Sequence, residues 1–196
     1  MNMKEYNKVK DLGYEEYCDY LKEKYGCAKY DYFRKSFTKD KRVTRTAEGL
    51  LCHHTREDEA PMLCNPSFAK VYPFEYQEAK NLCYCDYLEH LFLHMLIFEK
   101  TINCAGRVLG NGGITEFLVP ELNDFYSGFK PKAAWQQKCI KRVIRNKAVY
   151  LKLLKRYRDT SKDNMFYMSS FNEKFGNWDL EKNRQLIEEI EFYMYE

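Results

Sequence analysis

Histidine, tryptophan, proline and glycine are scarce in this chain: its 196 residues include four His, two Trp, five Pro and nine Gly. The longest apolar run lies near residues 91–98, far short of the roughly 20 residues that a membrane span needs. The opening residues, MNMKEYNKVKDLGYEEY, contain no apolar segment like that of a secretory signal. No repeat or low-complexity tract is present. We therefore expect a globular, cytoplasmic protein without a membrane partner.

The sequence also lacks motifs that would assign it to several common classes of enzyme. It contains no GK[ST] phosphate loop, no Rossmann fingerprint and no G-x-S-x-G serine nucleophile. Its eight cysteines form no CxxC pair, so we expect free, buried thiols rather than a zinc knuckle. Cys52, Cys64, Cys83 and Cys85 could still converge on a zinc ion, although their spacing is not specific.

Acidic residues are absent from one long stretch, although the net charge is only +3. From Phe125 to Arg158 there is none, and a second basic cluster runs from Lys29 to Arg45. Neighbouring cations on a helix repel one another, which favours a polyanionic partner over a merely solvated helix face. Phosphate contacts dominate nucleic-acid affinity, so DNA is the expected partner, with RNA not excluded. The candidate contact residues are Lys141, Arg142, Arg145, Lys152, Lys155 and Arg156.

Periodicity and turn signals predict helices towards both ends of the chain and strands in its middle. Residues 43–54 are typical of a hairpin, residues 55–80 of an irregular loop and residues 81–85 of a short strand. Asp86 and Glu89 form a capping box for a buried helix over residues 87–101. Further helices are expected over residues 13–25, 29–37, 114–126 (with a kink or break at Pro120), 133–146, 148–157 and 180–195.

These elements indicate an α+β fold that is mostly helical. We expect an N-terminal helical segment over residues 1–42 and a strand-containing middle over residues 43–103. A C-terminal helical region should follow over residues 104–196, with its basic stretch at residues 130–158.

All four histidines occur in two pairs. His90 and His94 lie four residues apart in YLEHLFLHML, so a helix would place both imidazoles on one face. His53 and His54 are adjacent at the end of a predicted strand. A lone histidine in an apolar helix is more often a packed core residue. The conjunction of two such pairs favours a metal site, because two imidazoles on one helix face need only a third ligand.

The middle of the chain resembles the HNH endonucleases, also called ββα-metal or His-Me finger nucleases, of the phage and homing type. The resemblance rests on His53-His54 at a strand end, on Asn81 at the head of a second strand, and on the His90-x3-His94 helix. The Asn81-x8-His90 spacing is similar to that of colicin-type DNases. The resemblance covers roughly residues 43–100 and implies a central finger of hairpin, long loop, short strand and helix.

The resemblance implies a role for each matching residue. His53, His90 and His94 would hold one divalent metal (Zn, Ni, Mn or Mg), and His54 would be the general base. Asn81 would hold His54 in position. The sequence departs from the family by lacking the proline of HHxxP. The residues that follow the pair are Arg56, a candidate phosphate contact, and Glu57, Asp58 and Glu59, any of which could join the metal.

The sequence leaves three functions open. The first is a metal-dependent DNA endonuclease, for which double-strand cutting by a single finger would favour a homodimer. The second is a non-catalytic member of the same fold that binds nucleic acid or protein and has a structural metal. The third is a helical interaction domain in which the four histidines are core packing and no metal binds.

Overall fold

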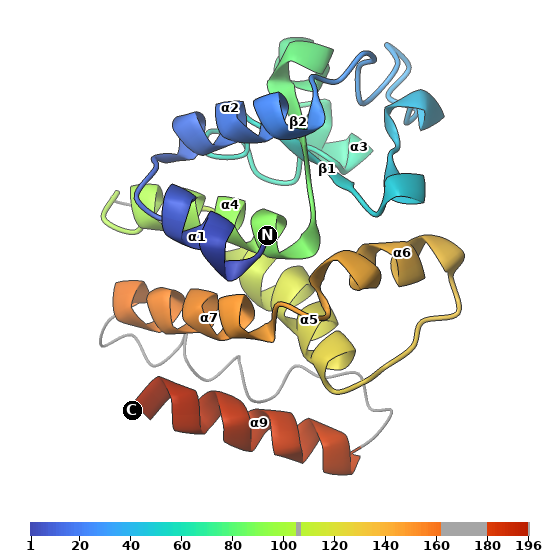
Figure 1. Cartoon of the computed structure of the whole chain (residues 1–196). Coiled ribbons are helices and arrows are strands. Elements are labelled where there is room, and N and C mark those ends of the chain that lie inside the picture. The colour runs from blue at the N-terminus through green and yellow to red at the C-terminus, as the bar shows by residue number, and fades with distance from the viewer. Residues whose placement is uncertain (105–106, 162–179, 196) are drawn as a thin grey trace.

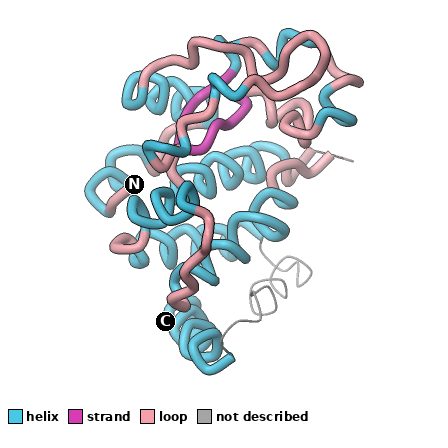
Figure 2. Tube along the Cα trace, turned by 90° about the vertical axis from the view of Figure 1, so that its right-hand side faces the viewer, coloured by secondary structure: helices cyan, strands magenta, loops and turns pink. Residues whose placement is uncertain are grey.

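The computed structural model describes residues 1–104, 107–161 and 180–195 and has the expected mostly helical α+β fold. A small sheet of β1 (Leu51–His54) and β2 (Leu82–Cys85) lies at one end of the molecule, and α4 (Tyr87–Thr101) follows β2 directly (Figures 1 and 2). The chain has further helices, most of which pack on α4 or on one another. They are α1 (Met3–Val9), α2 (Tyr14–Tyr25), α3 (Pro66–Ala69), α5 (Val119–Tyr126), α6 (Ala134–Val143), α7 (Lys147–Ser161) and α9 (Leu180–Tyr195).

The two strands pair antiparallel, with His53 opposite Cys83 and His54 opposite Leu82. Successive side chains of a strand point to opposite faces of a sheet. The His53 ring therefore lies against His90 of α4, whereas the His54 ring contacts Gln77 in the segment between the strands. The sheet thus separates the adjacent histidines onto two faces.

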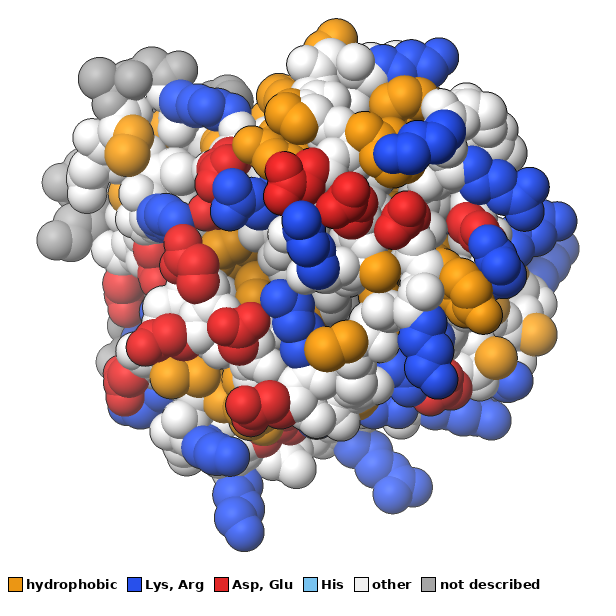
Figure 3. Space-filling view, turned by 90° about the horizontal axis from the view of Figure 1, so that it is seen from above, with side chains coloured by type: hydrophobic (Ala, Val, Ile, Leu, Met, Phe, Trp, Pro, Cys, Tyr) orange, Lys and Arg blue, Asp and Glu red, His pale blue; other side chains and the backbone are white. Residues whose placement is uncertain are grey.

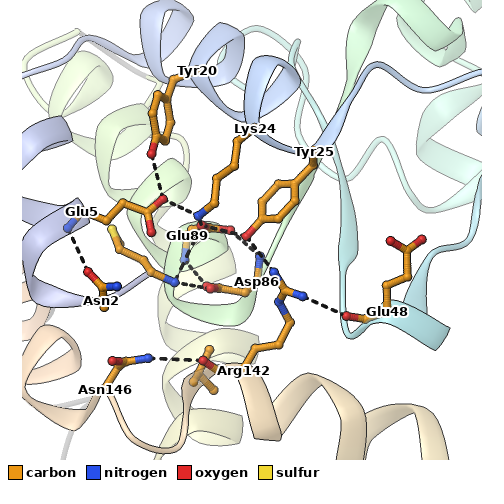
Figure 4. A network of polar contacts seen from close by, with 12 residues as sticks. Asn2, Glu5, Tyr20, Lys24, Tyr25, Glu48, Asp86, Glu89, Arg142 and Asn146 are labelled. Carbon is orange, nitrogen blue, oxygen red and sulfur yellow. Dashed lines mark hydrogen bonds and ion pairs between the residues drawn. The ribbon is translucent and has the colours of Figure 1, made fainter.

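Helix α4 is held at its N-terminus by a network of charged and polar groups (Figure 4). The predicted capping box is present: the Asp86 carboxylate accepts from the Glu89 N–H at 2.9 Å, and the Glu89 carboxylate accepts from the Asp86 N–H at 2.7 Å. Lys24 and Tyr25 of α2 donate to the same Glu89 oxygen at 2.5 and 3.1 Å. Because nearly every side chain of α4 is buried, this anchoring also fixes the helix face that carries the histidines.

The hairpin predicted over residues 43–54 does not form. Two 3-10 turns, Lys41–Val43 and Thr46–Glu48, precede β1, and β1 pairs with β2 instead. Val43 is fully buried, and its carbonyl accepts from the Tyr84 hydroxyl at 3.0 Å. A side-chain contact therefore replaces strand pairing at this position, and the predicted turn survives only as the left-handed Gly49, with φ of 76°.

The short helix predicted over residues 29–37 is also wrong. This segment is irregular and contains one isolated bridge, between Phe33 and Lys39. Tyr32 and Phe33 are buried in a small core with Leu82 of β2. Tertiary packing of these aromatic rings overrides the weak helical pattern of the local sequence.

The remaining helix predictions are confirmed within a few residues at their ends. The helix predicted over residues 114–126 consists of a π-helix, Gly113–Leu118, followed by α5, and Pro120 lies in the first turn of α5. The chain stays helical through Pro120, so no break occurs. The helix type changes from π to α just before this proline, which lacks the N–H of a regular helix.

One main core contains buried side chains from α1, α2, α4, α5, α6, α7 and α9, and so from all three predicted segments. None of the described helices combines the length and the apolar character that crossing a membrane requires.

Candidate metal centre

Three of the four histidines meet between β1 and α4. One nitrogen of each of His53, His90 and His94 lies within 4.8 Å of the other two, and the Nε2 atoms of His90 and His94 are 3.2 Å apart. Two nitrogens bound to one tetrahedral zinc at about 2.0–2.1 Å would be separated by roughly 3.3 Å. The spacing therefore suits a shared metal ion. Within the part of the chain that the structure describes, no other group of potential ligands converges in this way.

The chemistry of these buried imidazoles also fits a metal. Burial lowers the pKa of His53 and of His90 well below the usual value, and neighbouring histidines add to the effect. Both rings are therefore neutral at pH 7, which is the form that binds metals. Imidazole nitrogens suit zinc or nickel better than Mn²⁺ or Mg²⁺, which prefer oxygen ligands.

Tyr14 of α2 determines which nitrogen of His53 faces the centre. Its hydroxyl lies 2.8 Å from Nε2 of His53 and 3.3 Å from the His54 carbonyl, so it can donate to the carbonyl while accepting from Nε2–H. Nδ1 of His53 then has no hydrogen-bond partner among the described residues and is free to bind a metal. Metal-bound histidines commonly have such a partner on the second ring nitrogen.

Glu57 lies beside His53 and His94 and is the best candidate for a fourth ligand. Its Oε2 lies 3.5 Å from Nε2 of His94 and 3.8 Å from Nδ1 of His53. Burial raises the pKa of Glu57 to about 8, so a nearby cation would favour its ionised form. The two other carboxylates of this segment are engaged elsewhere: Asp58 accepts from Lys100 at 2.7 Å, and Glu59 accepts from a tyrosine hydroxyl at 2.8 Å.

His54 approaches the same carboxylate from the other face of the sheet. Its Nε2 lies 3.1 Å from Oε1 of Gln77, while the Gln77 amide donates to the Leu63 carbonyl at 3.3 Å, which fixes the orientation of the amide. The His54 proton is therefore on Nε2. Its Nδ1 has no hydrogen-bond partner among the residues that the structure describes and lies 3.8 Å from Oε1 of Glu57. Burial lowers the pKa of His54 to about 4, and the residue is only 1% exposed.

Asn81 does not contact the His54 ring. Its side-chain amide donates to the Glu75 carbonyl at 2.8 Å, and its own carbonyl accepts from the Thr55 N–H at 2.8 Å. Asn81 therefore ties the end of β1 to the start of β2 through the backbone, while Gln77 takes the side-chain contact that the family resemblance implied for Asn81.

A glycine segment that follows α4 closes one side of His94. A Cβ atom at Gly113 would overlap Cε1 and Nδ1 of the His94 ring, whereas a Cβ atom at Gly112 would meet open space. Gly113 begins the π-helix, a helix type that often occurs at functional sites. Because the glycine backbone occupies the Nδ1 side of the ring, Nε2 of His94 is the atom that faces His90 and Glu57.

Four of the seven predicted nucleic-acid contacts are engaged within the protein. Arg142 donates at 3.1 Å both to the Tyr25 hydroxyl and to the Glu48 carbonyl (Figure 4), and Arg156 donates to both oxygens of Glu99 at 2.6 and 2.7 Å. These arginines join elements of the fold. Of the others, Lys141, Arg145 and Lys152 are exposed, Lys155 lies over the Tyr193 ring, and Arg56 pairs with Glu59 at 3.0 Å.

The cysteines do not add ligands to the centre. All eight are free, and none joins a potential metal-binding group in the described residues. The expectation of burial holds for Cys18, Cys83, Cys85 and Cys139, but Cys27, Cys64 and Cys104 are exposed and Cys52 is half-buried.

Three residues near the histidines were not found by sequence reasoning: Tyr14, Gln77 and Gly113. Nothing in the spacing distinguishes Tyr14 among 17 tyrosines, and Gln77 lies in an irregular segment. Gly113 did carry a signal, because paired glycines in a break between helices can mark a close backbone approach.

Comparisons with protein-family models, with curated proteins and with solved structures found no match to this chain.

Proposed function

We propose that this chain is a metal-dependent endonuclease of the HNH type that hydrolyses DNA phosphodiester bonds. The observation that carries the proposal is the meeting of His53, His90 and His94 between a strand and a helix, with Nδ1 of His54 3.8 Å from the adjoining carboxylate of Glu57. The ββα-metal fold and the DNA partner belong to the same proposal.

Each residue has a chemical task in this proposal. His54 would take a proton from the attacking water at Nδ1, because Gln77 holds the other proton on Nε2. His53, His90 and His94, with Glu57 beside them, would hold the divalent metal. When bound, that metal supplies a Lewis acid at the scissile phosphate and stabilises the leaving oxygen.

A second candidate is a non-catalytic protein with a structural metal, which binds nucleic acid or protein. The burial of the proposed base favours it, because His54 is 1% exposed and lies behind Tyr32, whose ring centroid is 4.4 Å away. A base covered in this way cannot reach water until its cover moves. This candidate predicts tight metal binding and folding that depends on the metal, but no cleavage.

The test is to incubate supercoiled plasmid with the protein and Zn, Ni, Mn or Mg in turn, after measuring the bound metal. His54→Ala is compared with Cys52→Ala, which alters a neighbouring side chain of the same strand face that contacts none of the histidine ligands. The proposal expects cleavage by the wild type and by Cys52→Ala. It expects metal binding without cleavage by His54→Ala.

Other outcomes choose between the candidates. A wild type that binds metal but cuts neither plasmid, single-stranded DNA nor RNA supports the structural metal. A protein that binds no metal contradicts both candidates. His54→Asn serves as a second variant, because its polar side chain reduces the risk that a buried cavity unfolds the protein.

A further inference from the structure

A cavity lies on the face of the small sheet opposite to the cluster of His53, His90 and His94. It has a volume of about 400 Å³ and lies between the end of α2 and the 3-10 turns that precede β1. Its floor includes Tyr84 of β2, the residue after Cys83, which pairs with His53. Because successive strand residues face opposite sides, this cavity is separate from the metal centre. Its lining includes Tyr25, Lys29, Tyr30, Arg42, Arg45 and Tyr84.

Two guanidinium groups lie over two aromatic rings in this cavity. The Arg42 guanidinium carbon is 4.2 Å from the Tyr30 ring centroid, and that of Arg45 is 4.6 Å from the Tyr84 ring centroid. Carboxylates hold both groups in place: Arg42 donates to Asp40 at 2.6 Å, and Arg45 donates to Glu48 at 2.6 and 2.7 Å. The cavity therefore offers flat, preorganised surfaces of the kind on which nucleobases stack.

The entrance of the cavity is both aromatic and basic. Tyr30 retains 39% of its surface exposed, and the Arg42 side chain 62%. Lys29 is exposed and makes no ion pair with any residue that the structure describes. Lys and Arg side chains gather at the right-hand edge of the face in Figure 3, the side on which Figure 1 places residues 29–45 and α6. A phosphate would be attracted to this edge.

We propose that this cavity binds an unpaired nucleotide of a single-stranded nucleic acid, with its base stacked on the Tyr30–Arg42 surface and its phosphate near Lys29. The inference rests on the proposed function only in taking the same class of ligand. The separation from the proposed ligands His53, His90 and His94 means that the cavity contributes to affinity and not to metal binding. In a duplex the bases are already stacked on one another, so the cavity favours single strands over duplex.

Fluorescence anisotropy with a labelled oligo-deoxythymidine strand tests the inference. A phosphorothioate backbone prevents cleavage during the measurement. Tyr30→Ala should weaken binding of the strand about tenfold, because it removes one aromatic ring on which a base stacks. Tyr30→Phe keeps the ring and should bind like the wild type. Tyr195→Ala removes a tyrosine that is 80% exposed on α9 and is the matched control.

Arg42→Lys retains the positive charge but removes the planar guanidinium group. It should weaken binding of the single strand and leave binding of a matched duplex unchanged. Unchanged single-strand binding by Tyr30→Ala overturns the inference, as does an equal loss for strand and duplex. These outcomes are independent of the plasmid assay. If Tyr30→Ala loses strand binding and the wild type cleaves no substrate, nucleotide binding by the cavity is supported and the nuclease proposal is rejected. If the wild type cleaves and Tyr30→Ala binds the strand normally, the nuclease proposal is supported and the cavity proposal is rejected.

Discussion

The histidine cluster and the basic helices α6 and α7 differ in how their polar groups are satisfied. At the cluster of His53, His90 and His94, buried nitrogens of His53 and His90 have no hydrogen-bond partner in the described part of the protein. On the basic helices, Arg142 and Arg156 are already bound by groups of the protein itself. A buried polar atom without a partner is costly, whereas a surface cation is cheaply solvated. The first region therefore points to a ligand much more strongly than the second.

Metal removal gives the largest expected effect and tests the first half of this comparison. A ligand present at about 1,000 times its dissociation constant stabilises the folded state by about 4 kcal/mol, or about 10 °C in a chain of this size. We expect a chelator to lower the melting temperature of the zinc-loaded protein by this amount. Calorimetry with and without the chelator measures it.

His90→Ala and Cys83→Ala are the paired variants for this experiment. Both shorten a side chain next to His53, since Cys83 pairs with it across the sheet and the His90 ring packs on it from α4, but only His90 is a proposed ligand. His90→Ala should lose the response to zinc, and Cys83→Ala should keep it even if it melts at a lower temperature. A chelator that leaves the wild-type melting temperature unchanged would contradict a bound metal.

Short-range spacing made much of the site predictable, because the i, i+4 geometry of a helix fixes how His90 and His94 face. The capping box at Asp86 likewise fixed where that helix begins. The choice of strand partner for β1 was not predictable, since alternation in residues 43–54 does not reveal which distant segment supplies the hydrogen bonds. The ion pair between Arg156 and Glu99 was missed for the same reason: it joins residues far apart in sequence, so local charge counting took Arg156 as free.

The next largest effect should come from a single methyl group at Gly113. Gly113→Ala would drive a Cβ atom into the His94 ring, and such overpacking typically costs about 1–3 kcal/mol. Because the ring must turn or shift, Nε2 would leave its position beside His90. We expect zinc affinity to fall at least about tenfold, in the range seen when groups around a metal ligand are changed. Competition with a chromophoric chelator measures the affinity.

Gly112→Ala is the matched control, one residue earlier and with open space around the added methyl group. It should bind zinc like the wild type, and its stability should change by less than about 1 kcal/mol. The absorption spectrum of the cobalt-substituted protein separates a displaced ligand from general destabilisation, because it reports the geometry around the metal. Equal zinc affinity in both alanine variants would show that the glycine backbone does not position His94.

The smallest effects should distinguish the bound arginines from the exposed ones on the basic helices. Arg156→Ala removes charged hydrogen bonds to Glu99 and to the Lys10 carbonyl and should destabilise the fold by about 2 kcal/mol, measured by urea unfolding. Arg145→Ala alters an exposed side chain and should leave stability within about 0.5 kcal/mol.

If the basic helices contact DNA phosphates, Arg145→Ala should also lower the salt dependence of DNA affinity by about one counterion. A folded Arg156→Ala variant should leave this salt dependence unchanged, because the wild-type Arg156 guanidinium already has a carboxylate partner. A DNA affinity that depends on Arg156 but not on Arg145 would contradict this distinction between bound and exposed arginines. It would place a phosphate contact at Arg156 of α7, beside Glu99 of α4.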